Sequence, residues 1–273
     1  MDLVKKDGKR KGISQNSNEE NETKITTSVT LNVENQQKDL KTKSSNGNYQ
    51  QYYGKRHAEG RGGIGMNDPR IFLLKKAWFK GKRYLDVGCN SGIFTLALAK
   101  KFTTKSTIGI DIDQTLINEA ETNLKKELFQ SSLSKATIMV PRSVKKSKTE
   151  DQPTEPKDSP QTKSLKNVSF VCADFVSCSN SELTEKIGHK KFEVISALST
   201  VKWIHLSGGD ESVKTFFKKV FEMLEPGGMF ILEAQPWKSY SKKKRASEEA
   251  ARSFSSIQLF PKMFGDYLLG EQV

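Results

Sequence analysis

Residues 84–92, which read Tyr-Leu-Asp-Val-Gly-Cys-Asn-Ser-Gly, decide the fold of this chain. The first four residues are typical of a short strand, and a glycine turn follows from Gly88 to Gly92. An apolar stretch then predicts a helix from Ile93 to about Lys101. A strand, a glycine turn and a helix in this order form the first unit of a sheet whose strands are connected by helices.

The same alternation of strand and helix continues along the chain. Further strands are predicted at 106–112, 168–172, 192–198 and 229–233, and further helices at 114–128 and 211–224. Strands that alternate with helices pair in parallel through right-handed crossovers, so the predicted fold class is α/β with a doubly wound, mostly parallel sheet. In such sheets, ligands bind beyond the carboxyl ends of the strands.

The composition divides the 273 residues into a folded part and polar segments. Hydrophobic residues make up 35% of the chain and the mean hydropathy is -0.61, both low for a compact domain. The polar residues gather in two stretches that bury too little apolar surface to offset the entropy of ordering. We therefore expect a disordered arm over 1–45, one folded domain over 46–273 and a disordered insert at about 141–166.

The net charge of +13 favours polyanionic partners, which are nucleic acid, nucleotide-bearing ligands or an anionic membrane surface. No window approaches the roughly 18 consecutive apolar residues of a membrane span, and no secretory signal is recognisable, so we expect an intracellular protein without a membrane partner. Cys89, Cys172 and Cys178 lack paired spacing and the three histidines lie well apart. We therefore expect neither a disulfide framework nor a metal site.

The glycine turn and the end of the second predicted strand indicate a site for an adenosine cofactor. Asp111 lies 23 residues after Gly88, near the spacing at which an acidic side chain binds a ribose diol. A dinucleotide site would prefer G-x-G-x-x-G, whereas Gly88-x-x-x-Gly92 after Asp86 resembles the turn of S-adenosylmethionine methyltransferases. The alternative is a tight turn without a ligand. The conjunction with Pro226-Gly227-Gly228 before the last strand favours the cofactor site.

Six short blocks are distinctive by their order. They read GNYQQYYGKR (47–56), DPR (68–70), WFKG (78–81), LDVGCN (85–90), LSTVKWIHL (198–206) and QPW (235–237). Together they resemble the bicoid-interacting-protein family of RNA methylphosphate capping enzymes, over about 47–273 except the polar insert. The resemblance implies a Rossmann-like class I methyltransferase that uses S-adenosylmethionine to methylate a 5′ phosphate oxygen of RNA. Its typical acceptor is the γ-phosphate of a small nuclear RNA made by RNA polymerase III.

The resemblance also implies roles for individual residues. Cofactor contacts are implied at Tyr53, Arg70, Gly88, Cys89, Asn90, Asp111, Ile112 and Leu198. Asp174 and Phe175 stand where the family often has Asn-Tyr beside the adenine, so they are implied as cofactor contacts as well. Tyr52, Arg56 and Lys202 correspond to catalytic residues around the RNA 5′ phosphates.

The chemistry of the acceptor agrees with these roles. A terminal phosphate is already ionised near neutral pH, so its oxygen needs no general base, only a position in line with the methyl group. We therefore hypothesise that Arg56 and Lys202 clamp the phosphates as cations, while Tyr52 donates a hydrogen bond to the accepting oxygen. Arg70 and Tyr53 would cover the methionine end of the cofactor.

Several of these residues have a purely structural alternative. For Arg70 it is an ion pair with Asp68, and for His205 it is the orientation of the neighbouring loop. Trp237 either stacks on an RNA base or packs under the turn that precedes it. The basic run over 238–245 either steers the RNA backbone or is a solvated helix start.

Two other functions stay open at this stage. One is methylation of a 5′-monophosphate on a transfer RNA or microRNA precursor, and the other is an RNA-binding ribonucleoprotein scaffold with weak catalysis. The resemblance implies a small nuclear RNA 5′ end and a La-related protein as partners. It implies the nucleus as the location, with the cytoplasm as the alternative.

The end of the chain departs from the family. Methyltransferases of this fold close the sheet with antiparallel strands after the fifth strand, and this chain stops at Val273. We therefore expect the final antiparallel strands to be lacking, which would leave apolar surface and an open sheet edge. On this interpretation the chain is a fragment, less stable than a version that includes those strands.

Overall fold

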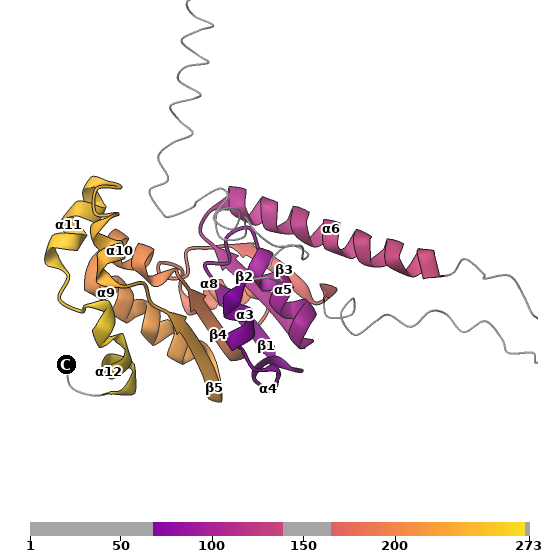
Figure 1. Cartoon of the computed structure of the whole chain (residues 1–273). Helices are drawn as coiled ribbons and strands as arrows, with labels where there is room; N and C mark the ends of the chain where they lie inside the picture. The colour runs from indigo at the N-terminus through magenta and orange to yellow at the C-terminus, as the bar shows by residue number, and fades with distance from the viewer. Residues whose placement is uncertain (1–67, 139–164, 271–273) are drawn as a thin grey trace, which may run out of the picture. The chain divides into compact units, whose positions relative to one another are not determined.

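The computed structural model describes residues 68–138 and 165–270, which form a parallel sheet of five strands with helices on both faces (Figure 1). The strands are β1 (Arg83–Val87), β2 (Ser106–Asp111), β3 (Val168–Cys172), β4 (Phe192–Leu198) and β5 (Leu224–Glu233). Their order in the sheet is β3-β2-β1-β4-β5, and every pairing is parallel. The predicted doubly wound α/β fold is confirmed.

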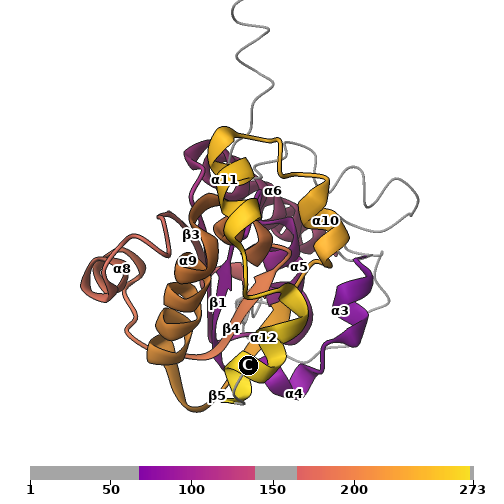
Figure 2. The same ribbon diagram turned by 90° about the vertical axis from the view of Figure 1, so that its left-hand side faces the viewer.

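Ten helical segments surround the sheet in the described part of the chain. They are α3 (Pro69–Leu73), α4 (Lys76–Phe79), α5 (Ile93–Phe102), α6 (Gln114–Ile138), α8 (Asn180–Ile187), α9 (Val201–Met223), α10 (Trp237–Ser241), α11 (Glu248–Ser256), η1 (Pro261–Met263) and α12 (Phe264–Leu269). One face of the sheet packs against α8, α9 and α12, and the other against α3 to α6 (Figure 2).

The central strand β1 explains why residues 84–92 predict the fold so well. Its register places Leu85 beside Ile108 of β2 on one side and Ile195 of β4 on the other. All residues from Tyr84 to Val87 are buried, as expected of a parallel strand that is covered by helices on both faces. The carboxyl end of β1 therefore lies in the middle of the sheet edge where ligands bind.

Three elements have bounds that differ from the sequence prediction by more than two residues. Helix α6 continues to Ile138 rather than to about residue 128. The helical region α9 begins at Val201 rather than at 211. Gly208 and Gly209 interrupt its helical geometry, so the predicted helix corresponds to its later part and residues 201–207 form an additional helical segment. Strand β5 begins at Leu224, which pairs with Phe192, and the Pro-Gly-Gly segment lies in a register shift before the next pairs.

The predicted arm over 1–45 and most of the predicted insert over 141–166 lie outside the described residues. Leu165, near the end of that insert, is buried in a cluster with residues of α5, α6 and β3. Strand β5 forms one edge of the sheet, and within residues 68–138 and 165–270 only helical segments follow it. No helix of this part has the length and apolar character to cross a membrane.

Candidate active site

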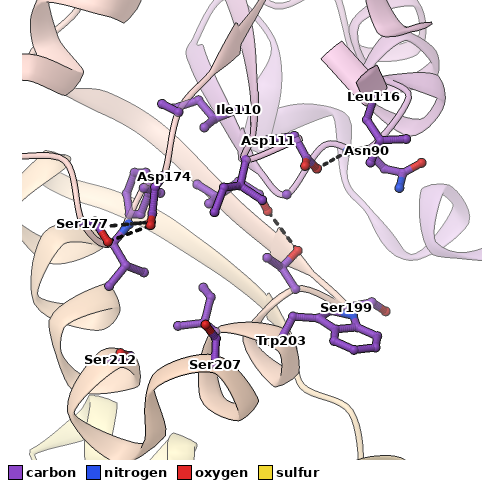
Figure 3. Close-up of a pocket in the computed structure, with 18 of the residues that line it drawn as sticks. Asn90, Ile110, Asp111, Leu116, Asp174, Ser177, Ser199, Trp203, Ser207 and Ser212 are labelled. Carbon is purple, nitrogen blue, oxygen red and sulfur yellow. Dashed lines mark hydrogen bonds between the residues drawn. The ribbon is translucent and has the colours of Figure 1, made fainter. Parts of the chain in front are cut away.

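A pocket opens at the carboxyl ends of the central strands, where the fold predicts a ligand (Figure 3). Its walls come from the turn after β1, the end of β2, the loop after β3 and the first part of α9. Seven predicted cofactor contacts line it, namely Gly88, Asn90, Asp111, Ile112, Asp174, Phe175 and Leu198. The fold thus brings predicted residues from four separate segments of the chain to one pocket.

The turn after β1 contains residues with left-handed backbone conformations. Gly88 has φ +79°, and a Cβ atom there would lie 2.2 Å from Oγ1 of Thr200. Asn90 also has a positive φ of 51°, and its N–H donates to Oδ2 of Asp111 at 2.8 Å. A non-glycine residue in this conformation is strained and persists where the surrounding bonds hold it. The turn is therefore fixed to the end of β2.

Asp111 presents an anionic acceptor to the pocket. Its second oxygen accepts the N–H of Asp113 at 3.1 Å, so each oxygen receives one main-chain donor and has acceptor capacity left. Burial raises the pKa of Asp111 above its usual value, although these main-chain hydrogen bonds act in the opposite direction. A carboxylate held in this way can accept hydrogen bonds from a diol.

Asp86, the acidic residue of the glycine motif, has a structural role. It is 3% exposed and lies outside the pocket lining. Its carboxylate accepts from the hydroxyl groups of Thr95 at 2.6 Å and Ser196 at 2.7 Å. Burial raises its pKa, and these hydroxyl donors oppose the rise. Asp86 therefore connects β1 to α5 and β4 beneath the turn.

The loop after β3 forms the opposite wall with a compact hydrogen-bonded turn. Asp174 accepts from the N–H groups of Val176 at 2.9 Å and Ser177 at 3.0 Å, and from the Ser177 hydroxyl at 2.7 Å (Figure 3). Burial alone would raise the pKa of Asp174, but these hydrogen bonds outweigh it and hold the pKa below the usual value. The carboxylate of Asp174 thus shapes the loop that lines the pocket.

Lys219 of α9 stabilises this loop by hydrogen bonds to its main chain. Its ammonium group donates to the main-chain carbonyl groups of Phe175, Val176 and Cys178. Burial lowers the pKa of Lys219, while nearby acidic groups, among them Cys178 and Asp174, raise it. One side chain therefore fixes the main chain of residues 175–178 next to the pocket.

The wall formed by β4 and α9 contains Ser199, which the sequence analysis did not assign. Ser199 has φ +63°. Its hydroxyl donates to Oε2 of Glu233 at 2.7 Å, and its carbonyl accepts from Nε2 of Gln235 at 2.7 Å. These bonds from β5 and the residues after it hold the strained backbone. No sequence signal beyond its place in the block at 198–206 indicates this role.

Arg70 lies outside the pocket lining and makes the ion pair that was its structural alternative. Its guanidinium bonds both oxygens of the buried Asp68, at 3.0 and 2.7 Å, and reaches Glu233 at 3.0 Å. Glu233 in turn accepts from Ser199, so Arg70 is linked to the pocket wall through one carboxylate. The predicted contact between Arg70 and the cofactor stays a prediction.

Cys89 is 1% exposed and also lies outside the pocket lining. Burial raises the pKa of its thiol well above the usual value, so the group is neutral and packs as a small apolar side chain. Its predicted cofactor contact is likewise untested. Tyr52, Tyr53 and Arg56 lie outside the described residues, and their roles stay predictions.

Lys202 stands beside the pocket in the first turn of α9. It is 6% exposed, its Nζ donates to Oγ of Ser239 at 3.0 Å, and the ammonium lies 4.5 Å from the ring centroid of Trp203, which lines the pocket. Burial, and to a lesser degree Lys243, lowers the pKa of Lys202 to about 8. The ammonium group of Lys202 therefore lies next to Trp203, which is the aromatic residue of this part of the pocket lining.

Trp237 packs against protein side chains. Its ring stacks on Phe254 with centroids 4.6 Å apart and an interplanar angle of 9°, and it meets Phe260 edge-on. Trp237 is thus partly buried against Phe254 and Phe260 rather than under the preceding turn, and stacking on an RNA base stays an untested alternative. Three side chains of the basic run, Lys238, Lys242 and Arg245, are exposed.

The kink in α9 adds residues that periodicity does not reveal. Ser207 and Ser212 flank the two glycines and both line the pocket. A sequence analysis that ends one element at these glycines has no reason to place Ser212 at the site.

Across residues 68–138 and 165–270, no three His, Cys, Asp or Glu side chains are grouped so that they could hold a metal ion.

Family models and known relatives match this chain. A family model described as Bicoid-interacting protein 3 (Bin3) matches residues 192–273, and one described as a methyltransferase domain matches 79–138. A probable RNA methyltransferase of Arabidopsis thaliana is 38% identical over 82% of this chain and 70% of its own length. The U6 snRNA methylphosphate capping enzyme Amus of Drosophila melanogaster is 32% identical over 87% of this chain and 68% of its own.

A third relative is much longer than this chain. The 7SK snRNA methylphosphate capping enzyme of Mus musculus is 34% identical over 83% of the chain, which spans 36% of the mouse protein's length.

Proposed function

The chain belongs to the Bin3 family of RNA methyltransferases, and we propose that it methylates a 5′ phosphate oxygen of an RNA with S-adenosylmethionine as the methyl donor. The observation that carries the proposal is the Asp111 carboxylate, which the Asn90 amide holds beside the glycine turn in a pocket at the carboxyl ends of the strands. This is where an adenosine-bearing cofactor binds in a doubly wound sheet.

Residues from three strand ends would hold the cofactor. Asp111 would accept hydrogen bonds from the ribose hydroxyl groups, since its oxygens keep acceptor capacity. The loop with Asp174 and Phe175 would border the adenine, and the close backbone approach at Gly88 would admit the methionine end. The bound cofactor supplies an electrophilic methyl group on a sulfonium.

The protein's task at the acceptor is to bind and orient an anion. A terminal phosphate has a second pKa of about 6, so its oxygen attacks without a general base and becomes the ester oxygen as the sulfur–carbon bond breaks. Lys202 supplies a cation next to Trp203, and we propose that Arg56 and Tyr52 complete the phosphate clamp. Burial of Lys202 strengthens its attraction to the phosphate, because water screens it less.

The substrate that we propose is the 5′ γ-phosphate of a small nuclear RNA. The Drosophila and mouse relatives are named for U6 and 7SK snRNA. The exposed cations Lys238, Lys242 and Arg245 lie in and just after α10, next to the partner of Lys202, and would follow the RNA backbone. We place the reaction in the nucleus on the same ground, and a La-related protein on the same RNA stays a proposed partner.

The acceptor is tested with labelled S-adenosylmethionine and one RNA that carries a 5′ triphosphate, monophosphate or hydroxyl group. We expect transfer to the triphosphate and none to the hydroxyl RNA. Lys202→Ala is expected to slow single-turnover transfer by at least about tenfold with unchanged cofactor affinity. Lys214→Ala, at an exposed position of α9, serves as the control.

Preference for the monophosphate RNA would show that the acceptor is a 5′-monophosphate and would contradict the proposed γ-phosphate acceptor. Absence of label on every RNA, with intact cofactor binding, would overturn the proposal and favour a binding scaffold.

A further inference from the structure

The first part of α9 is not oriented by a continuous helix. Gly208 has φ -137° and ψ 16°, and Gly209 has φ 66° and ψ -163°, so helical geometry is interrupted between residues 201–207 and the rest of α9. The later part is anchored to the sheet by a buried row of Val213, Phe216, Phe217 and Val220. The first part packs separately through buried Val201 and Leu206, so this packing and the bonds that cross the kink together set its angle.

A side-chain hydrogen bond spans the kink, and burial lowers the pKa of the His205 imidazole, which favours its neutral form. Nε2 of His205 lies 2.7 Å from Oδ1 of Asp210, and His205 is fully buried. The other oxygen of Asp210 accepts the main-chain N–H groups of Gln258 at 2.9 Å and Leu259 at 3.0 Å. Asp210 thereby connects both parts of α9 to the segment that follows α11.

The ring of His205 also contacts α10 and α12. It lies edge-on to Tyr240 of α10, with centroids 5.5 Å apart, and tilted to Phe264 of α12 at 5.9 Å. Nδ1 and the Tyr240 hydroxyl are 3.4 Å apart. Tyr240 follows Ser239, which accepts from Lys202, so His205 and Lys202 contact neighbouring residues of α10.

We infer that His205 and Asp210 are positioning residues, which hold the segment 201–207 at the angle that brings Lys202 and Trp203 to the acceptor side of the pocket. The activity part of this inference rests on the proposed function. An apolar pair of similar volume could fill the same space, but it could not bond across the kink or accept the N–H groups of Gln258 and Leu259. The His205–Asp210 pair makes both contacts. Its hydrogen bonds are directional, and they cross the kink where no main-chain helical geometry is available.

His205→Leu removes the link, and His205→Gln keeps a side-chain N–H donor for Asp210. His189→Leu is the matched control, because His189 packs edge-on to Phe192 and does not line the pocket. Two readouts are needed. Amide hydrogen exchange of 201–207 measures how firmly this segment is held, without any reaction. Steady-state kinetics gives kcat, and calorimetry separately gives the cofactor Kd.

For His205→Leu we expect exchange of 201–207 to accelerate about tenfold and kcat to fall about tenfold, while the cofactor Kd changes by less than about threefold. His205→Gln should recover most of both, and His189→Leu should match the wild type. If His205→Leu does not fold, Asp210→Asn, which retains an acceptor for the two main-chain N–H groups, should show the same changes to a lesser degree.

Wild-type exchange in both the Leu and the Asn variants would overturn the inference. A cofactor Kd that weakens in step with kcat would do the same, because it would indicate a general loss of structure. Faster exchange of 201–207 in a protein that methylates no RNA would leave the positioning intact and contradict the proposed function instead.

Discussion

Two sides of the pocket are held together by different kinds of contact. The cofactor side consists of the turn after β1 and the loops after β2 and β3, and the acceptor side consists of Lys202 and Trp203 of α9. On the cofactor side, main-chain N–H groups of short turns donate to carboxylates at the ends of β2 and β3, as between Asn90 and Asp111. On the acceptor side, side chains of α9 bond groups far along the chain, as Lys202 does with Ser239 and Asp210 with Leu259. The first side depends on the sheet, and the second on long-range polar contacts together with the packing of Val201 and Leu206 of α9.

This difference predicts that the two sides respond separately to mutation. A segment that few directional contacts hold opens more readily than the turns of a central parallel sheet. Changes on the cofactor side should therefore affect binding of S-adenosylmethionine, and changes on the acceptor side should affect turnover with little effect on that binding.

The largest effect is expected from Gly88→Ala. The added Cβ would lie 2.2 Å from Oγ1 of Thr200 at a φ of +79°, so the turn must move away from the pocket. We expect cofactor affinity to fall by at least about 100-fold, measured by calorimetry. Gly81→Ala is the control, because Gly81 has φ +70° with no atom within 4 Å of the added Cβ. It should cost about 1 kcal/mol of stability and leave cofactor binding intact. Equal cofactor affinities in the two variants would contradict the role of the close approach.

Lys219→Met should weaken the cofactor side without disturbing the acceptor side. The three carbonyl groups of Phe175, Val176 and Cys178 would lose their shared donor, and the loop that lines the pocket would loosen. We expect the KM for S-adenosylmethionine to rise about tenfold and the KM for RNA to stay the same. Lys218→Met, at the exposed neighbouring position, should change neither constant. A rise in both KM values for Lys219→Met would argue against separate sides.

The acceptor side should show its own dependence on pH. Burial lowers the pKa of Lys202 to about 8, so the free enzyme loses this cation as the pH rises through that value. The kcat/KM for RNA should therefore rise as the terminal phosphate ionises near pH 6 and fall above about pH 8. Lys202→Arg keeps its charge throughout and should abolish the alkaline fall. An unchanged alkaline limb in this variant would show that another group titrates.

The smallest effect is expected at the amino ends of the strands, away from both sides of the pocket. Arg83 bonds Glu193 at 2.9 Å and Glu225 at 2.7 Å, and its side-chain bond to Glu193 is the main cause that lowers the pKa of Glu193 to about 2. Arg83→Ala should cost about 1 kcal/mol of stability with unchanged kcat. The loss should be complete above about pH 4.5, the unfolded-state pKa, and shrink as the pH falls through about 2. Chemical unfolding at pH 7 and pH 3 measures it, and a loss of kcat would contradict the assignment.

The contrast between the two sides also decides what the sequence could predict. Gly88, Asn90 and Asp111 were predictable, because the geometry they serve is encoded within one strand, one turn and the end of the next strand. The resemblance located Lys202, but nothing in the pattern indicated its bond to Ser239 or its depressed pKa. Such contacts depend on how α9 and α10 meet, which has no local signature.

The early start of α9 escaped prediction for a related reason. Gly208 and Gly209 do interrupt the helical geometry, and the His205–Asp210 hydrogen bond joins the two helical parts across them. The same kink places Ser212 at the pocket. Arg70 shows the reverse case, since its family position implies a cofactor contact whereas its observed bonds go to Asp68 and Glu233.

The position of the transferred methyl group tests the proposed reaction most directly. After single-turnover reaction of labelled S-adenosylmethionine with 5′-triphosphate RNA, an enzyme that removes the two outer phosphates should release all of the label, and the RNA body should retain none. Label that stays with the RNA body after this treatment would place the methyl group on a base, a ribose or the inner phosphate, and would contradict methylation of the γ-phosphate.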